Sequence, residues 1–458
     1  MNDETREAFH DAAGYRVASI PGAVVILGGG STGEHFAGAL RDLDRTVTIT
    51  LVERELVGGE CSYWACMPTK AMLRPLEALA AARLAPGCIA TGFDVDRVFW
   101  HRDETVSRRD DSSQETWLGE RDVELVRGSA RVVEPGVVEV DGRRLSYDRL
   151  VVATGSVPIV PPIAGLEEAG YWTNREATET LTVPESIAVV GAGPVGCEFA
   201  QFFHRVGSRV VLVDTVERLL PREDPEAGLL LRDHFEEEGI DIRCGTRVER
   251  VEPGGRVQLE NGDVLEAERL LVAAGRRANT DGLELERLGV TLGERGVEVD
   301  ERMRAAEGVW AIGDVTGIAM FTHVGKYHAR VAAADMAGRE VRADYSAIPA
   351  VTFTDPQVAS VGRAGGDGLV TGSYRVDSIA RTSTYERPKR AGLLKLFADP
   401  ERCVLVGAVA VGPEAGEWLG QLTLAIKAEV PIDVLRDTIQ PYPTFSEGIF
   451  LALKELEL

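Results

Sequence analysis

The chain has 458 residues, and its formal net charge is −23 at pH 7. A chain this acidic repels the phosphates of nucleic acids, so nucleic acid is not an expected partner. Its composition, 44% hydrophobic and 27% charged residues, is typical of globular proteins, and its length suggests about three domains. Six cysteines in a chain of this length are too few for a disulfide scaffold. This favours a reducing, cytoplasmic location, where a disulfide is more often catalytic than structural.

The N-terminus, residues 1–19, is polar and acidic and lacks the basic and apolar regions of a signal peptide. We interpret it as an N-terminal extension ahead of the first domain. No apolar run in the sequence approaches the length of a membrane span, so we expect a soluble protein with no membrane partner.

A dinucleotide-binding pattern follows the extension. Residues 23–27 form an apolar run typical of a buried strand, and residues 47–52 form a second run that ends at Glu53. Between them stands a glycine fingerprint, GxGxxG, made by Gly28, Gly30 and Gly33 and followed by a helical stretch. Glycines at this spacing permit a tight turn and close approach of the backbone to a pyrophosphate, and the carboxylate can bind a ribose hydroxyl.

The next motif contains two cysteines, Cys61 and Cys66, with Pro68 and Lys70 close behind. On a regular helix their Cα atoms would lie about 8.6 Å apart, whereas a disulfide needs roughly 4.4 to 6.8 Å. A bridge would therefore require a distorted backbone, for which the preceding glycines and Pro68 are suited. From these residues alone, two structural cysteines buried as small hydrophobic residues are the alternative. Zinc is disfavoured because no CxxC pair accompanies them.

The dinucleotide pattern then recurs. An apolar run at 187–190 precedes a second fingerprint, and a run at 210–213 ends at Asp214. The glycines of this fingerprint are Gly191, Gly193 and Gly196. We interpret the repeat as a second dinucleotide site, because neither copy has lost a glycine or its carboxylate. One site and a decayed copy is the alternative.

Asp214 bears on the choice of cofactor. A carboxylate at this position suits the unmodified 2′-hydroxyl of NAD and repels the 2′-phosphate of NADP, which usually binds an arginine. Arg218 lies nearby, but it follows Glu217 in a loop-like stretch and is interpreted as solvated. The sequence therefore favours NAD over NADP.

Several further elements are predicted from apolar periodicity and turn residues. They are a small antiparallel sheet over 128–133, 137–140 and 144–145, strands ending in small residues at 147–156 and 269–275, a strand with an acidic end at 308–314, and helices at 416–430 and 444–458. The remaining cysteines stand singly on apolar segments and are predicted to be core residues: Cys88, Cys197, Cys244 and Cys403.

The ordered motifs resemble those of the pyridine nucleotide-disulfide oxidoreductase family, which includes dihydrolipoyl dehydrogenase, glutathione reductase and mercuric reductase. The resemblance covers nearly the whole chain from Ile20 and looks closest to the dihydrolipoyl dehydrogenase and mercuric reductase branches. The matching pieces are the first fingerprint with Glu53, the Cys61/Cys66 motif, Val152–Gly155, the second fingerprint with Asp214, Ala274–Arg276, Ala311–Asp314 and Tyr442–Glu447.

The resemblance implies an α/β fold with two Rossmann-like domains, one for FAD and one for NAD(P), and a C-terminal α+β dimerisation domain. The domains would be the extension 1–19, a FAD-binding domain in two segments, 20–158 and 283–344, an NAD(P)-binding domain at 159–282 and a dimerisation domain at 345–458. The FAD site would be lined by the first fingerprint and by Glu53, Lys70, Ala130, Gly155, Asp314, Met320 and His323. The NAD site would include Gly275 besides the second fingerprint and Asp214.

Roles in catalysis follow from the same resemblance. Hydride from NADH would reduce the flavin, which would reduce a Cys61–Cys66 disulfide. Cys66 matches the thiol that faces the flavin, and Cys61 matches the interchange thiol that attacks the substrate as a thiolate. Lys70 matches the family lysine near flavin N5, and Glu198 matches its ion-pair partner.

The sequence departs from the family near its C-terminus. Dihydrolipoyl dehydrogenase and glutathione reductase carry a histidine acid/base, contributed by the partner subunit, where this chain has Tyr442, although Pro443 and Glu447 are retained. A tyrosine is a poor base at neutral pH. Mercuric reductases resemble the chain in having tyrosine there, but they add a C-terminal cysteine pair, whereas no cysteine follows Cys403. Two histidines, His323 and His328, are alternative bases, although a structural role is favoured for both.

We therefore expect a homodimeric FAD-dependent NAD(P)H:disulfide oxidoreductase, an enzyme acting on a sulfur group, that passes electrons from NADH to a small disulfide or another acceptor. No resident metal is expected. The alternatives are a diaphorase that reduces quinones or metal ions, and a non-catalytic NADH-sensing flavoprotein. The intact cysteine pair disfavours the sensor, since a binding module does not need two thiols beside a flavin.

Overall fold

The computed structural model describes residues 20–386 and 392–458, and the predicted extension 1–19 lies outside them. Within the described residues the chain divides into two compact units. Unit 1 combines the described part of Met1–Cys61 with Arg109–Val157 and Arg277–Ala343, and unit 2 combines Ser62–Arg108, Pro158–Arg276 and Asp344–Leu458. The division into domains inferred from the sequence stays a prediction.

Unit 1 is built on a six-stranded sheet in the order β17-β18-β7-β1-β2-β3. Its strands from β18 to β3 run parallel, and β17 is antiparallel to β18. The central strands are apolar and largely buried, as expected for parallel strands covered on both faces. The strand bounds are β1 Ala23–Leu27, β2 Thr48–Glu53, β3 Val123–Arg127, β7 Arg149–Val152, β17 Arg304–Ala306 and β18 Val309–Ala311.

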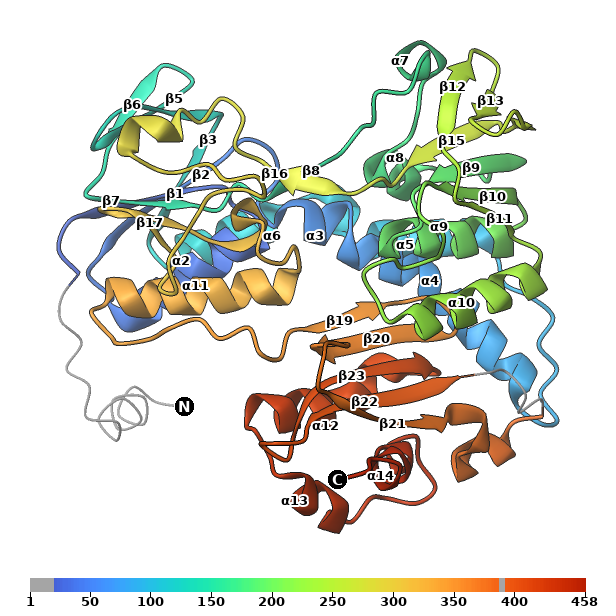
Figure 1. The fold of residues 1–458 in the computed structure, drawn as a ribbon. Coiled ribbons are helices and arrows are strands. Elements are labelled where there is room, and N and C mark those ends of the chain that lie inside the picture. Colours follow the sequence, from blue (N-terminus) through green and yellow to red (C-terminus); the bar gives the residue numbers. More distant parts are fainter. Residues whose placement is uncertain (1–19, 387–391) are drawn as a thin grey trace. The chain divides into compact units, whose positions relative to one another are not determined.

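One face of this sheet is covered by two helices that pack against each other, α2 (Ser31–Leu43) and α11 (Thr322–Met336) (Figure 1). The other face packs against the small antiparallel sheet β4-β5-β6, whose prediction is confirmed. The bounds of these and neighbouring elements are β4 Ala130–Glu134, β5 Val137–Val140, β6 Arg143–Ser146, α6 Ser112–Gly119 and the 3-10 turn η3 Gly313–Thr316.

The half of unit 2 that carries the second glycine fingerprint repeats this plan with a parallel sheet in the order β11-β10-β9-β15. In both sheets the strand before a glycine fingerprint lies between the strand after it and a later strand, which is the arrangement of dinucleotide-binding folds. Helices α4 and α5 pack on each other, and α4 also contacts α9. The bounds are β9 Ser186–Val190, β10 Arg209–Asp214, β11 Asp241–Cys244, β15 Arg269–Val272, α4 Cys66–Leu84, α5 Val95–Thr105, α8 Asn174–Glu179, α9 Pro194–Arg205 and α10 Pro225–Glu238.

The C-terminal half of unit 2 is an antiparallel sheet in the order β19-β20-β23-β22-β21. One face joins the core formed with α9 and α10, and the other packs on α12 and α14 (Figure 1). The predicted fold class, two Rossmann-like sheets and a C-terminal α+β domain, is therefore confirmed. The bounds are β19 Pro349–Thr352, β20 Gln357–Gly362, β21 Val370–Arg375, β22 Leu393–Asp399, β23 Val404–Gly412, α12 Ala415–Lys427, α13 Ile432–Asp437 and α14 Glu447–Lys454.

Two predictions are wrong in detail. The last helix is shorter than 444–458, because the residues after Pro443 form a turn and α14 begins only at Glu447. Of the four single cysteines, Cys197 is buried and Cys244 half-buried, but Cys88 and Cys403 are exposed. Cys88 directly follows a Pro-Gly turn, and Cys403 has a positive φ of 51° in the turn between β22 and β23, so apolar neighbours did not indicate burial.

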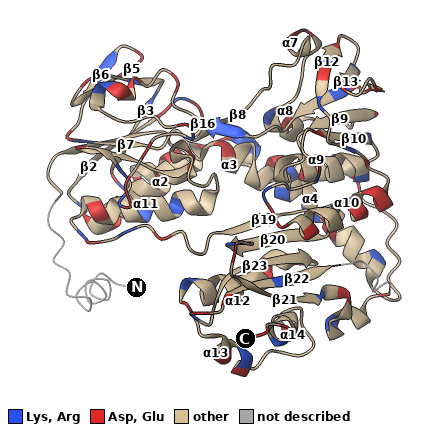
Figure 2. Cartoon of the chain, viewed as in Figure 1, with Lys and Arg blue, Asp and Glu red and all other residues tan. Residues whose placement is uncertain are grey.

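Residues of both charge signs are interspersed along the ribbon of each unit (Figure 2). Among residues 20–386 and 392–458, no helix combines the length and the apolar composition that a membrane crossing requires. The same described residues contain no group of three or more His, Cys, Asp or Glu side chains that could hold a metal ion.

Candidate functional site

The first glycine fingerprint joins β1 to α2. Gly28 has a φ of +103°, and a Cβ there would lie 2.4 Å from the carbonyl oxygen of Ala153. A Cβ at Gly33 would lie 2.0 Å from the carbonyl oxygen of Gly28. A Cβ at Gly30, by contrast, would meet only the Cα of Gly59 at 3.9 Å. Packing therefore requires the first and third glycines, whereas the middle one faces the room that close approach of a pyrophosphate needs.

The carboxylate of Glu53 lies at the end of β2 and accepts two backbone hydrogen bonds. Its Oε2 accepts from Gly29 N at 2.7 Å, and its Oε1 accepts from Glu55 N at 2.7 Å. These bonds fix both oxygens beside the glycine loop. Each oxygen keeps a further lone pair, so the carboxylate can still accept a bond from a ribose hydroxyl.

Other predicted FAD-lining residues of unit 1 lie at strand ends. Asp314, in η3 after β18, accepts a hydrogen bond from Ser156 Oγ at 2.7 Å. Gly155, after β7, has a φ of +74°, and its carbonyl accepts from Asn279 N at 3.0 Å. The other three lie at the start of β4 (Ala130), just before α11 (Met320) and in the first turn of α11 (His323, whose ring stacks on that of Phe321).

A cavity of about 320 Å³ adjoins the N-terminal end of α2. The carboxyl side chain of Glu34 lines this cavity. Burial raises its pKa to about 7, and the positive charge of Lys326 opposes this rise. The sequence analysis missed this cavity because its walls come from three separated helices. The lining residues are Ser31, Glu34, His35, Ser113, Gln114, Trp117 and Lys326.

The second fingerprint, between β9 and α9, has the same local geometry. Gly191 has a φ of +118°, and a Cβ there would lie 2.3 Å from the carbonyl oxygen of Ala273. A Cβ at Gly196 would lie 1.8 Å from the carbonyl oxygen of Gly191, whereas nothing lies within 4 Å of one at Gly193. This loop therefore leaves the same room above its middle glycine.

Asp214 ends β10 as predicted. Its Oδ2 accepts from Ala192 N at 2.5 Å, and its Oδ1 accepts from Val216 N at 3.1 Å. The guanidinium of Arg218 donates to the carbonyls of Pro221 at 2.9 Å and Glu223 at 3.5 Å. Arg218 is therefore engaged by its own loop.

Gly275 closes the predicted nucleotide site after β15. Its φ is +122°, and its carbonyl accepts from Ile159 N at 2.9 Å. The positive φ explains why a glycine stands there.

The two cysteines do not share one regular helix. Cys61 lies in α3 (Gly59–Tyr63), and Cys66 is the first residue of α4. Between them Ala65, the N-cap of α4, has non-helical angles, with φ −131° and ψ −99°. Both cysteines are half-buried. A cysteine in the first turn of a long helix is placed where the helix N-terminus favours a thiolate.

Lys70, in the second turn of α4, forms an ion pair with Glu198 of α9. Its Nζ lies 2.8 Å from Oε2 and 3.0 Å from Oε1 of the carboxylate. A third residue, not predicted, completes the arrangement: Phe353 N donates to Glu198 Oε1 at 2.9 Å, and the Phe353 ring centroid lies 4.7 Å from Nζ.

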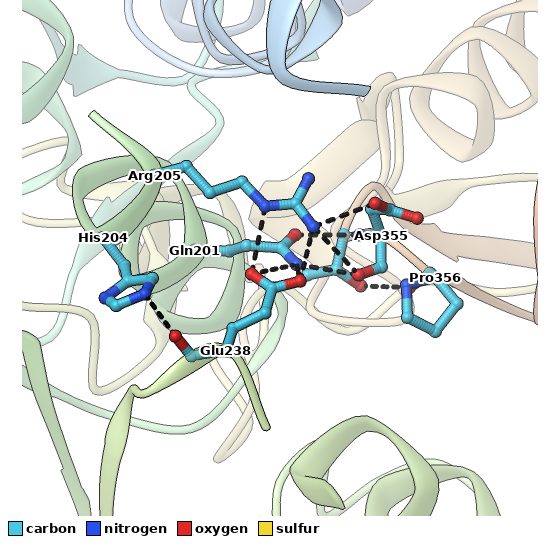
Figure 3. A network of polar contacts seen from close by, with 7 residues as sticks. Gln201, His204, Arg205, Glu238, Asp355 and Pro356 are labelled. Carbon is cyan, nitrogen blue, oxygen red and sulfur yellow. Dashed lines mark hydrogen bonds and ion pairs between the residues drawn. The ribbon is translucent and has the colours of Figure 1, made fainter. Parts of the chain in front are cut away.

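The turn that carries Phe353 is held by a polar network on α9 (Figure 3). Gln201 Oε1 accepts from Asp355 N, and its Nε2 donates to the Asp355 carbonyl, both at 2.8 Å. Arg205 pairs with Glu238 at 2.5 Å and with Asp355 at 2.9 Å. The spacing of Glu198, Gln201 and Arg205 places them on one face of a helix, a signal that was available in the sequence.

Tyr442 and Glu447, which are predicted to complete the site across a dimer, differ in their exposure. Tyr442 is 74% exposed in the single chain. Glu447 begins α14, and its Oε2 is buried with no hydrogen-bond partner in the part of the chain that the structure describes. The carboxylate is thus retained, whereas the tyrosine at the histidine position faces outward.

His328 lies in the core of unit 1. Its Nδ1 accepts a hydrogen bond from Gly313 N at 3.1 Å, and burial lowers its pKa to about 4. The ring is therefore neutral at pH 7 and faces the backbone beside Asp314. This supports the structural interpretation of His328 over the catalytic one.

Known proteins match nearly the whole length of the chain. The family model described as pyridine nucleotide-disulphide oxidoreductase matches residues 22–337, and the model of that family's dimerisation domain matches residues 348–452. A mercuric reductase of Lysinibacillus sphaericus is 32% identical over 448 residues, which are 94% of this chain and 81% of that protein. A dihydrolipoyl dehydrogenase of Thermus scotoductus is 33% identical over 454 residues, 94% of this chain and 97% of that protein.

Solved structures resemble the chain to a similar extent. LpdA from Mycobacterium tuberculosis superposes with a TM-score of 0.85 at 26% identity, covering 94% of this chain and 99% of that one. RclA from Escherichia coli, an HOCl-induced flavoprotein disulfide reductase solved as a Cu(II) complex, superposes with a TM-score of 0.82 at 25% identity, covering 93% and 98%.

Proposed function

Because the chain belongs to the pyridine nucleotide-disulphide oxidoreductase family, we propose that it is a FAD-dependent, NAD(P)H-oxidising enzyme whose working thiols are Cys61 and Cys66. The observation that carries the proposal is the break between α3 and α4. It places Cys66 at a helix N-terminus, one turn before a lysine that is fixed by a buried carboxylate.

The two glycine loops fit the two dinucleotides. Each leaves room above its middle glycine and holds a carboxylate against the loop backbone. Bound FAD would supply two-electron transfer between the pyridine nucleotide and the cysteine pair. The carboxylate of Glu53 would hold its ribose, and Asp314 and Gly155 would line it, as the family resemblance implies.

The thiols would reduce a disulfide acceptor in two exchanges. The thiolate of Cys61 attacks one sulfur of the acceptor, forms a mixed disulfide and releases the other sulfur as a thiolate. The thiolate of Cys66 then attacks Cys61 Sγ, which re-forms the Cys61–Cys66 disulfide and releases the second thiolate. The acceptor gains two electrons, and both released thiolates take a proton from water or a nearby acid.

We propose NADH as the preferred reductant. The support is the charge at Asp214 together with the engagement of Arg218 by its own loop, which leaves the carboxylate facing a 2′-phosphate without a compensating guanidinium from that residue. We also propose a homodimer, which the match to the dimerisation-domain model supports.

A second candidate is direct reduction of a metal ion or a quinone, with the thiols less important. The observation that favours it is Tyr442, since a tyrosine, a poor base at neutral pH, stands where disulfide-reducing family members carry a histidine acid/base. The mercuric reductases among its relatives and the Cu(II) complex of RclA point the same way. A non-catalytic NADH sensor remains the alternative from another class.

The deciding experiment is an anaerobic titration of the purified protein with NADH, alongside Cys61→Ser and Cys66→Ser variants, with thiols counted by alkylation. We expect wild type to consume enough NADH to reduce both flavin and disulfide and to release two thiols. Each serine variant should stop at the flavin. If wild type also stops at the flavin and releases no thiol, the disulfide mechanism is wrong and direct flavin acceptors come first. Rapid NADH binding with no turnover on disulfides, quinones or metal ions would support the sensor.

A further inference from the structure

Trp64 lies between the two cysteines in the sequence. Three side chains of α8, a helix far from it in the sequence, contact it. Its indole Nε1 donates to Glu179 Oε1 at 2.7 Å, and its backbone carbonyl accepts from Asn174 Nδ2 at 2.8 Å. The guanidinium of Arg175 lies 4.2 Å from the centroid of its ring. We propose that Trp64 is a positioning residue that fixes the cysteine loop, and we call Trp64, Asn174, Arg175 and Glu179 the Trp64 clamp.

The helix that supplies the clamp has a capped N-terminus. Asn174 is the first residue of α8, and its N-cap Thr173 forms a capping box with Glu176. A capping box satisfies backbone donors that the first turn would otherwise leave open. Asn174 is 7% exposed and Trp64 is 8% exposed, so their bond lies where water competes little. A capped helix and a buried hydrogen bond therefore hold the clamp in place within unit 2.

The clamp acts on the backbone that leads into Cys66. The carbonyl of Trp64 is bonded to Asn174, and the next carbonyl, that of Ala65, accepts from both the N–H and the hydroxyl of Thr69. Both carbonyls before Cys66 thus have fixed donors, so the path from α3 into α4 has little freedom. Holding two groups in a fixed geometry raises their effective concentration. The clamp should therefore favour closure of the Cys61–Cys66 disulfide.

The clamp also contacts the predicted nucleotide motif. Asn174 Oδ1 accepts from Arg276 Nη1 at 3.3 Å, and Arg276 directly follows Gly275. Asn174 therefore bonds the cysteine loop through one end of its amide and the nucleotide motif through the other. The inference rests on the proposed redox role of the cysteines, but its prediction concerns their equilibrium and not turnover.

The test measures the fraction of protein with an oxidised pair in buffers of defined reduced to oxidised dithiothreitol, by alkylation and mass spectrometry of the holoenzyme. The variants are Trp64→Phe, Asn174→Ala and Glu179→Leu, with Glu179→Gln as the conservative change that keeps an acceptor for the indole. The matched control is Trp100→Phe, because Trp100 in α5 is 42% exposed and also carries an arginine, Arg97, 3.8 Å from its ring centroid.

We expect the three disruptive variants to shift the equilibrium about tenfold towards the dithiol, because a freer backbone between the cysteines lowers the effective concentration of one thiol at the other. Glu179→Gln and Trp100→Phe should stay within about twofold of wild type on the same scale. Because Glu179 is exposed, Glu179→Leu tests the clamp even where Trp64→Phe fails to fold. Wild-type equilibria in all three disruptive variants would overturn the inference. Failure of the proposed function is a separate result, since it appears as wild type releasing no thiol on reduction by NADH.

Discussion

The ion pair of Lys70 and Glu198 is unevenly exposed: the side chain of Glu198 is 6% exposed and that of Lys70 is 33% exposed, while their closest charged atoms lie 2.8 Å apart. A buried charge that loses its partner is strongly destabilising, whereas a charge that water can reach is not. Besides Lys70, the carboxylate accepts a bond from Phe353 N, which is too little to replace a cation. The two members of the pair therefore differ in what their loss would cost.

We expect Lys70→Met to lower the free energy of unfolding by about 3 kcal/mol and Glu198→Gln by only about 1 kcal/mol. The first change leaves the Glu198 carboxylate buried without its cation, and the second leaves a lysine that water can solvate. Urea unfolding of the two variants, checked for equal FAD content, measures the difference. The exposed pair of Arg232 and Glu236, side chains 36% and 47% exposed, supplies the control Arg232→Met, which should be neutral. Equal losses in the Lys70 and Glu198 variants would contradict the argument.

Tyr442→His should increase reduction of a small disulfide such as lipoamide by about 10²-fold, the lower range for a general acid/base. The buried Oε2 of Glu447, which has no hydrogen-bond partner in the described residues, is available to orient an imidazole placed nearby. Steady-state rates with lipoamide and NADH over pH 6–9 test this.

The matched controls for this prediction are Tyr442→Phe and the double variant Tyr442→His with Glu447→Gln. Tyr442→Phe should leave lipoamide turnover near the wild-type level, because a tyrosine contributes little as a base. The double variant should lose most of the gain, because the amide cannot stabilise an imidazolium. A gain that survives Glu447→Gln in full would show that the carboxylate does not act on the histidine.

Asp214→Asn should shift the ratio of kcat/KM for NADH to that for NADPH about tenfold towards NADPH, equivalent to about 1.4 kcal/mol of relieved repulsion. Asparagine keeps one of the two oxygens that accept from the loop backbone, so one of these two bonds should persist. Arg218→Ala should leave the ratio unchanged, because Arg218 bonds to the carbonyls of Pro221 and Glu223. A fall in NADPH use in Arg218→Ala would mean that this arginine does reach the nucleotide.

The parts of the candidate site that could be predicted from the sequence are those whose residues lie close together in the chain. Each glycine fingerprint, its flanking strands and its carboxylate lie within one βαβ unit, and the hydrogen bonds of Glu53 and Asp214 to the loop backbone follow from that spacing. The pairing of Lys70 with Glu198, more than a hundred residues apart, came only from resemblance to a family. The sequence by itself contains no signal for it.

The parts that were missed join segments far apart in the chain. Trp64 bonds to α8 across more than a hundred residues, and Phe353 approaches Glu198 from the turn between β19 and β20. Such contacts depend on how α4, α8 and α9 pack, which periodicity does not specify. Cys88 and Cys403 are wrong predictions of a different kind. Their apolar neighbours suggested burial, but Cys403 lies in a turn, Cys88 directly follows one, and both are exposed.

His328 gives unit 1 a predictable sensitivity to acid. Its pKa is lowered from 6.5 to about 4 in the folded chain because the ring is buried and neutral, with Nδ1 accepting from Gly313 N. Between these two values the unfolded chain binds a proton that the folded chain does not, so stability falls as the pH drops from 6.5 towards 4. At about 1.4 kcal/mol per pH unit, this single group would remove about 3 kcal/mol over that window.

His328→Gln should abolish this contribution, since an amide oxygen can accept from Gly313 N and does not titrate. We therefore expect the variant to lose less Tm than wild type between pH 6.5 and pH 4.5, while both have similar slopes above pH 7. His101, in the exposed outer turn of α5, supplies the control His101→Gln, which should follow wild type throughout. Parallel Tm curves for wild type and His328→Gln would refute the assignment of acid sensitivity to His328.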